Sequence, residues 1–237
     1  MDIKGYIFDY GGTIDTQGCH WGQMIWHAYE RQQVPVEEYM FREAYVFAER
    51  TLGKNPIIQP DYTFHKTLEV KLRIEFDYLI ERGYLNEGNF RSASLKAAVL
   101  NDLYDRVKTI TSESRKVLTS LKKRYPLVLV SNFYGNIDVV LQEFGLDGIF
   151  DGIVESAVVG IRKPNPEIFK LGVKALKLNE DSVAVVGDSI DKDIVPAKKA
   201  GCFTIWLKGE GWNEQPDICA EADKYITSLR ELLGDMQ

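Results

Sequence analysis

The first segment whose residue types could do chemistry is DYGGT at residues 9–13, which follows an apolar pair at residues 7–8. A carboxylate that leaves the carboxyl end of a strand in an open α/β sheet projects into the crevice where such folds bind ligands. Adjacent glycines let backbone amides approach an anion closely. Asp9 is therefore a candidate nucleophile or metal ligand.

Three later segments also place polar groups after apolar runs. Ser131 and Asn132 follow such a run, and their side chains can donate to an oxyanion or cap the next helix. In residues 160–169, two prolines pre-set the backbone around Lys163 just before a helical pattern. Residues 185–194, VVGDSIDKDI, end a further apolar run in closely spaced carboxylates, which suit Mg²⁺.

The elements that must position these groups alternate from about residue 111 onward. Helical patterns occupy 113–125, 137–144, 166–176 and 193–200, and extended patterns occupy 127–131, 149–154, 182–186 and 203–207. This alternation predicts an α/β fold, a parallel sheet covered by helices on both faces. The apolar runs at 128–130 and 183–186 are typical of central strands, which are buried on both faces.

Residues 18–110 show a different pattern, with long helical stretches and no clear strand. The stretches are 21–32, 37–51, 64–82 and 92–108, with turn-forming breaks at 53–56 and 83–88. The sequence therefore predicts an all-helical insertion after the first strand.

Composition excludes some functions. The 237 residues carry a formal net charge of −6, with no basic stripe, which opposes nucleic acid as the main partner. We find no apolar run long enough to span a bilayer and no leader before the first strand, so we expect a cytoplasmic protein without membrane partners. The three cysteines are widely spaced and suggest neither a disulfide framework nor a thiolate metal site.

The four polar segments, in this order, resemble the four motifs of the haloacid dehalogenase superfamily. The resemblance implies a Rossmann-like parallel sheet core, formed by residues 1–17 and 111–237, and a helical cap domain at 18–110. The cap is matched only by position and length, so no substrate residue can be carried over from it. The substrate and the oligomeric state therefore stay open.

By this resemblance, Asp9, Ser131 and Lys163 are the catalytic residues. Asp9 looks like the nucleophile that forms a covalent aspartyl intermediate. Ser131 is similar to the donor that binds the phosphoryl oxygens, with Asn132 beside it. Lys163 matches the lysine that neutralises charge on the nucleophile and the transferring group.

The resemblance also implies a Mg²⁺ cofactor. Its ligands would be Asp9, the backbone carbonyl of Gly11, and Asp188, with Asp193 supporting the metal or orienting the lysine. Gly12 matches the turn that shapes the substrate-binding loop after the nucleophile. Asp191 falls outside the usual spacing, and we expect a solvated residue at a helix start.

The sequence departs from the family pattern at Gly11. Phosphatases of this superfamily usually read DxDGT, where the second Asp protonates the leaving group and then activates water. Gly11 keeps the carbonyl but has no acid. Loss of a positioned acid or base costs on the order of 10²–10⁴-fold in rate. Asp15 lies one residue earlier than the acidic residue that often follows DGT, and we give it no catalytic role.

The resulting expectation is a Mg²⁺-dependent hydrolase of a small phosphorylated metabolite, working through an aspartyl-phosphate at Asp9. One alternative is a phosphonate hydrolase, for which Lys54 on a cap loop is a conceivable Schiff-base lysine. A second is a 2-haloacid dehalogenase-like enzyme, which works without metal. A third is a degenerate protein that binds Mg²⁺ and a phosphorylated ligand without turnover.

Two further expectations concern the cap. His20, on the linker just after the first motif, either contacts substrate and supplies the missing proton transfer or simply starts a helix. Linkers near residues 18 and 110 are expected to let the cap hinge over Asp9.

Overall fold

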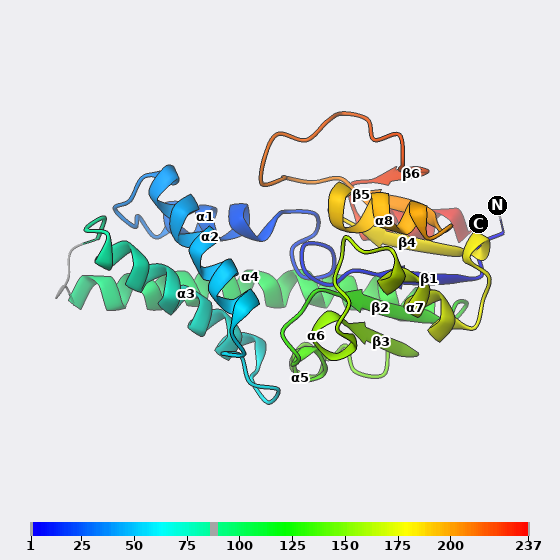
Figure 1. The fold of residues 1–237 in the computed structure, drawn as a ribbon, viewed down its shortest axis with the longest axis horizontal. Helices are drawn as coiled ribbons and strands as arrows, with labels where there is room; N and C mark the ends of the chain where they lie inside the picture. Colours follow the sequence, from blue (N-terminus) through cyan, green and yellow to red (C-terminus); the bar gives the residue numbers. More distant parts are fainter. Residues whose placement is uncertain (1, 86–89, 237) are drawn as a thin grey trace.

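The computed structural model describes residues 2–85 and 90–236 and centres on a six-stranded parallel sheet with strand order β3-β2-β1-β4-β5-β6 (Figure 1). This order confirms the predicted α/β class and places β1 and β4 at the centre. The short edge strand β6 was absent from the sequence prediction. The strands are β1 Gly5–Phe8, β2 Leu127–Ser131, β3 Gly152–Glu155, β4 Val183–Gly187, β5 Phe203–Leu207 and β6 Lys224–Ile226.

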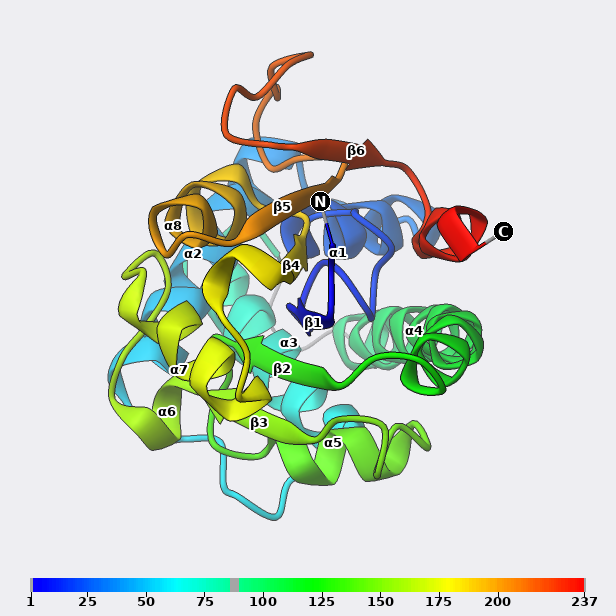
Figure 2. The same ribbon diagram turned by 90° about the vertical axis from the view of Figure 1, so that its right-hand side faces the viewer.

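Helices cover both faces of the sheet (Figure 2). Val183 and Val185 of β4 belong to the hydrophobic cluster that contains α7 and α8, whereas Ala184 and Val186 belong to the cluster that contains α4. This alternation follows from the two-residue period of a strand. The α-helices are α1 Trp21–Arg31, α2 Glu38–Lys54, α3 Phe64–Glu81, α4 Phe90–Lys122, α5 Ile137–Glu143, α6 Ser156–Val159, α7 Glu167–Leu176 and α8 Val195–Lys199. The other helices are the 3₁₀-helices η1 Glu180–Ser182 and η3 Leu229–Met236 and the π-helix η2 Ile190–Ile194, which carries Asp193.

The segment between β1 and β2 is helical throughout its regular elements, as predicted. Its interior is aromatic: the Tyr29 ring lies 5.0 Å from that of Phe41 and 5.4 Å from that of Phe76, measured between centroids. Such rings bury large apolar areas and favour tilted contacts of this kind. The helices α1, α2 and α3 are thereby held together as one packed unit.

The predicted linker near residue 110 is wrong. The structure joins the expected helices 92–108 and 113–125 into one helix, α4, which passes along both the helical part and the sheet (Figure 1). Thr111 lies inside it, and its hydroxyl donates to the Val107 carbonyl at 2.7 Å. Of the two predicted linkers, only the one through Gly18, which has φ of +88°, lies outside helices and strands.

The predicted breaks at 53–56 and 83–88 lie where α2 and α3 end, although residues 86–88 fall outside the described part of the chain. Across residues 2–85 and 90–236, none of the helices has the length and apolarity needed to cross a bilayer.

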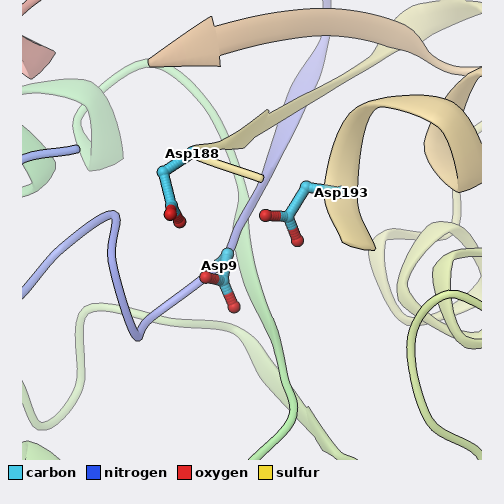
Figure 3. Close-up of side chains that lie close together, drawn as sticks. All are labelled: Asp9, Asp188 and Asp193. Atoms are coloured by element: carbon cyan, nitrogen blue, oxygen red, sulfur yellow. The ribbon is translucent and has the colours of Figure 1, made fainter. Parts of the chain in front are cut away.

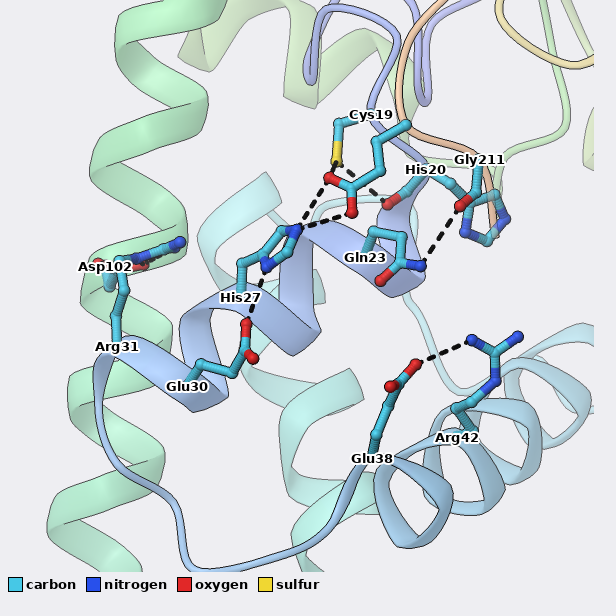
Figure 4. A network of polar contacts seen from close by, with 11 residues as sticks. Cys19, His20, Gln23, His27, Glu30, Arg31, Glu38, Arg42, Asp102 and Gly211 are labelled. Atoms are coloured by element: carbon cyan, nitrogen blue, oxygen red, sulfur yellow. Dashed lines mark hydrogen bonds and ion pairs between the residues drawn. The ribbon is translucent and has the colours of Figure 1, made fainter. Parts of the chain in front are cut away.

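A long loop between β5 and β6 reaches over the helical part (Figure 1). The loop contacts α1. The Gln23 side chain donates to the Gly211 carbonyl at 3.3 Å (Figure 4). The His27 ring contacts the Glu210 carboxylate. Arg42 of α2 donates to the Trp212 carbonyl at 3.0 Å. The loop therefore joins the sheet domain to the predicted cap.

Candidate active site

Polar residues from three neighbouring strands meet at one edge of the sheet. Ser131 is the last residue of β2, Asp9 follows β1, and Asp188 follows β4. The strands run parallel in the order β2-β1-β4, so their carboxyl ends lie side by side. This edge is where open α/β sheets bind ligands.

Three carboxylates form a compact cluster at this edge. Asp9, Asp188 and Asp193 each offer an oxygen, and these oxygens lie within 4.8 Å of one another (Figure 3). All three residues are buried. Carboxylate oxygens are the ligands that Mg²⁺ prefers in proteins. Together with the Lys163 ammonium, the cluster has a formal net charge of −2, which a divalent cation balances.

Lys163 contacts two members of the carboxylate cluster, one of which is the candidate nucleophile. Its ammonium contacts the Asp9 carboxylate and donates to Oδ1 of Asp193 at 2.7 Å. The other oxygen of Asp193 accepts from the Ser189 backbone N–H at 3.1 Å. Asp193 therefore orients the lysine, while its expected support of a metal stays a prediction.

Burial controls the protonation of these groups. Burial raises the pKa of Asp9 to about 6, the Lys163 ammonium opposes that rise, and Asp193 adds to it. The pKa of Asp188 is also raised, by burial and then by the charges of Asp193 and Asp9. For Lys163, burial opposes the charge, but the carboxylates of Asp193 and Asp9 outweigh it and raise its pKa. Lys163 therefore stays cationic.

The loop after Asp9 requires glycine at residue 12. Gly12 has φ of +99°, and a Cβ atom there would lie 2.4 Å from Oδ1 of Asp188. Thr13 donates its hydroxyl to the same Asp188 oxygen at 3.0 Å. At Gly11, a Cβ atom would make only ordinary contacts, the nearest being 3.7 Å from Nε1 of Trp21. A Cβ atom is therefore tolerated at residue 11, where the chain carries none.

Asp15 has a structural task that its sequence position did not reveal. One of its carboxylate oxygens accepts from the Gly12 N–H at 2.7 Å and the other from the Trp21 indole at 3.0 Å. Burial raises the pKa of Asp15 to about 8. The residue lines the same cavity as Asp9, and its two bonds hold the glycine loop against the start of α1.

Ser131 and Asn132 lie on the cavity wall, but their roles divide. Ser131 is buried at the end of β2. The amide of Asn132 donates to the Lys163 carbonyl at 3.1 Å and accepts from the Lys163 N–H at 3.0 Å. Asn132 thus positions the lysine, while a direct contact of Asn132 with substrate stays a prediction.

His20 lies at the cavity wall and starts α1. Its Nδ1 accepts from the Gly22 N–H at 3.0 Å, the cap interaction of a helix start. Burial, with smaller effects from Lys192 and Lys71, lowers the pKa of His20 to about 4. A neutral ring whose Nδ1 is already bonded is a poor proton donor at neutral pH.

Two other predicted positions lie away from the chemistry. Asp191 is exposed at the cavity rim, as expected for a solvated residue. Lys54 is exposed at the end of α2 and does not line the cavity, so it is not placed for a Schiff base with a substrate bound there.

The cavity that Asp9 lines has a volume of about 630 Å³. The sequence did not predict its far wall, the part of the lining that comes from α2, α3 and the β5–β6 loop. Lys71 of α3 and Glu49 of α2 form an ion pair there, at a distance of 2.5 Å. Trp212 reaches the wall from the β5–β6 loop. These residues come from separate elements, and no local pattern in the sequence links them.

The comparisons with known proteins agree with the fold. A family model for haloacid dehalogenase-like hydrolases matches residues 3–201. Two glyceraldehyde 3-phosphate phosphatases are similar to the chain. The one from Methanocaldococcus jannaschii is 38% identical over 94 residues, 39% of this chain and 40% of that protein. The one from Pyrococcus furiosus is 31% identical over 162 residues, 67% of each chain.

A solved structure shares the fold over the full length. It is the magnesium-bound putative HAD-hydrolase YfnB from Bacillus subtilis, with a TM-score of 0.57 and 18% identity, covering 100% of this chain and 99% of that one. The chain belongs to the haloacid dehalogenase-like hydrolase family, as the four motifs indicated. The alignment of this chain with the Methanocaldococcus phosphatase covers less than half the length of that relative.

Proposed function

We propose that the protein is a Mg²⁺-dependent phosphate monoester hydrolase that works through an aspartyl-phosphate at Asp9. The observation that carries this proposal is the contact of the Lys163 ammonium with Asp9 and Asp193, beside the three clustered carboxylates. A metal-free dehalogenase has no need of Asp188 in this cluster. The phosphatase names of the relatives and the magnesium of the YfnB structure support the same conclusion.

The side chains divide the work of such a reaction. A carboxylate oxygen of Asp9 attacks phosphorus, a new O–P bond forms, and the bond from phosphorus to the ester oxygen breaks. Lys163 and the Ser131 hydroxyl stabilise the charge on the phosphoryl oxygens. Water then attacks phosphorus, and the O–P bond to Asp9 breaks. The proton that the water loses to solvent balances the proton that the departing alkoxide takes up, so the products are an alcohol, inorganic phosphate and free Asp9. Asp9, Asp188, Asp193 and the Gly11 carbonyl would hold the Mg²⁺ ion, which would supply further charge stabilisation.

The direct test is release of inorganic phosphate from a generic aryl phosphate with Mg²⁺ or with excess EDTA. We expect turnover with Mg²⁺ and its loss in EDTA, with recovery when Mg²⁺ is added back, because the carboxylate cluster needs a cation to face a phosphate. Equal rates in both conditions would contradict metal-assisted chemistry. Absence of turnover in both would favour a protein that binds without catalysing.

Metal binding should depend on pH. Protons compete with Mg²⁺ because burial raises the pKa of Asp9 to about 6 and that of Asp188 above its ordinary value. Each competing proton weakens apparent affinity by about tenfold per pH unit below its pKa. Asp9 is already half protonated at pH 6, so we expect the Mg²⁺ concentration for half-maximal thermal stabilisation to rise at least about fivefold between pH 6 and pH 5. A concentration that does not change over this range would contradict the assigned ligands.

A further inference from the structure

The cavity extends well beyond the phosphoryl site and is walled by rings. Its volume of about 630 Å³ lies in the range that encloses drug-sized ligands, larger than a phosphate group needs. Aromatic side chains of this kind stack on planar ligands. The rings come from α1, α2, α3, the segment after β2 and the β5–β6 loop: Trp21, Tyr45, Phe64, Phe133, Tyr134 and Trp212.

The Lys71–Glu49 pair is the main charged feature among these rings. The Lys71 ammonium donates to Oε1 of Glu49 at 2.5 Å and lies 4.6 Å from the centroid of the Tyr45 ring. Burial opposes both charges, but Glu49 raises the pKa of Lys71 and Lys71 lowers the pKa of Glu49. Glu49 lines the cavity and keeps 41% of its side chain exposed.

The wall has no surplus positive charge. Lys71 is balanced by Glu49, and the His20 ring is neutral at working pH because burial lowers its pKa to about 4. The other lysines that line the cavity are Lys163, at the phosphoryl end, and Lys192, which is exposed. Among the described residues of this wall, Lys192 has no ion-pair partner, but it is exposed to solvent. A carboxylate or second phosphate on the leaving group would therefore find no buried unpaired cation there.

The Lys71–Glu49 pair is complementary to an uncharged group that carries one hydrogen-bond donor and one acceptor next to each other. The Glu49 carboxylate can accept from an N–H, and the Lys71 ammonium can donate to a neighbouring C=O. An N–H and a C=O lie next to each other on the edge of a lactam heterocycle, such as the uracil ring. The surrounding rings fit the planar faces of the same group.

We propose that the leaving group carries a planar, uncharged lactam heterocycle, as in a nucleoside monophosphate, and that Lys71 and Glu49 bind its N–H/C=O edge. This inference rests on the proposed function, because it assigns the far part of the same cavity. It makes Lys71 and Glu49 specificity-determining residues that touch the leaving group and take no part in the phosphoryl transfer.

Binding measurements test the inference separately from turnover. With Mg²⁺ and the Asp9→Asn variant, which lacks the nucleophile, calorimetry compares uridine 5′-monophosphate with its 3-methyl derivative and with phosphoglycolate. We expect uridine 5′-monophosphate to bind at least about tenfold more tightly than either, because methylation removes the N–H and phosphoglycolate lacks the ring. Phosphoglycolate binding as tight as that of the nucleotide would overturn the proposal.

Variants then locate the recognition. In Glu49→Gln, the dissociation constants of the nucleotide and its 3-methyl derivative should differ by no more than about threefold, because the charged acceptor is lost. Lys71→Met should weaken nucleotide binding about tenfold or more. The matched control Lys54→Met, at an exposed residue that does not line the cavity, should leave nucleotide binding within about twofold of wild type. Unchanged discrimination in Glu49→Gln would overturn the edge contact. Lack of any acetyl phosphate turnover in wild type would count against the proposed function instead, while the binding series would still decide this inference.

Discussion

Asp9→Asn should abolish phosphate hydrolysis, with kcat reduced by at least about 10⁴-fold, the scale of loss when an enzyme loses its nucleophile. The amide is close in shape to the carboxylate but cannot form the acyl-phosphate. It also removes one anion from the pair of carboxylates that Lys163 contacts. The measurement is phosphate release from an aryl phosphate, with single-turnover mixing and acid quench to detect phosphorylated protein in wild type.

A loss of fold must be separated from a loss of chemistry. Burial raises the pKa of Asp9 in the folded protein from its ordinary 3.8 to about 6, so the ionised form costs stability as pH rises through this interval. The neutral Asn removes that cost, and we expect the melting temperature in EDTA at pH 7 to be unchanged or raised. Asp138→Asn, at an exposed residue of α5, is the matched control and should keep wild-type turnover. Wild-type activity in Asp9→Asn would rule out the proposed nucleophile.

The phosphoryl end of the site could be predicted from the sequence because each of its residues carries a local signal. Asp9, Ser131 and Asp188 each follow a continuous apolar run, and parallel strands bring their carboxyl ends together. Lys163 stands before a proline-marked helix start. These signals lie within short segments, so they can be recognised without knowledge of the tertiary packing.

The far wall carries no comparable signal. Glu49 and Lys71 lie 22 residues apart on two helices, and only the packing of α2 against α3 makes them a pair. Trp212 comes from a loop whose path depends on contacts such as that of Arg42 with its carbonyl. The residues that contact a leaving group are therefore fixed by tertiary structure, which a single sequence does not reveal.

The error in α4 has a local cause. Residues 109–112, TITS, include β-branched and hydroxyl side chains that lower helix propensity and resemble a break. In the structure the hydroxyls of Thr109 and Thr111 bond to carbonyls of the preceding turn, and Ser114 donates to the Ile14 carbonyl at 2.8 Å. Packing outweighs propensity here. Because α4 is continuous through this point, motion of the cap would have to use the connection near Gly18 or bend the helix itself.

Gly11→Asp should raise turnover of alkyl phosphates by about 10²–10⁴-fold, the usual effect of a positioned general acid. An alkoxide leaving group needs a proton, and wild type has no side chain at residue 11 to give one. The backbone accepts a substitution there, because a Cβ atom at Gly11 would lie 3.7 Å from Nε1 of Trp21 and the residue needs no positive φ. The fixed Asp15–Trp21 bond keeps that indole in place.

The gain should depend on the leaving group. Acetyl phosphate, whose acetate leaves without a proton, should gain far less than an alkyl phosphate, so the ratio of the two kcat values reports general acid catalysis. Gly11→Asn is the matched control, because it has a similar shape and no acid, and we expect no gain from it. An equal gain for both substrates, or for both variants, would show that residue 11 acts on the loop and that the reaction in wild type is not limited by a missing proton donor.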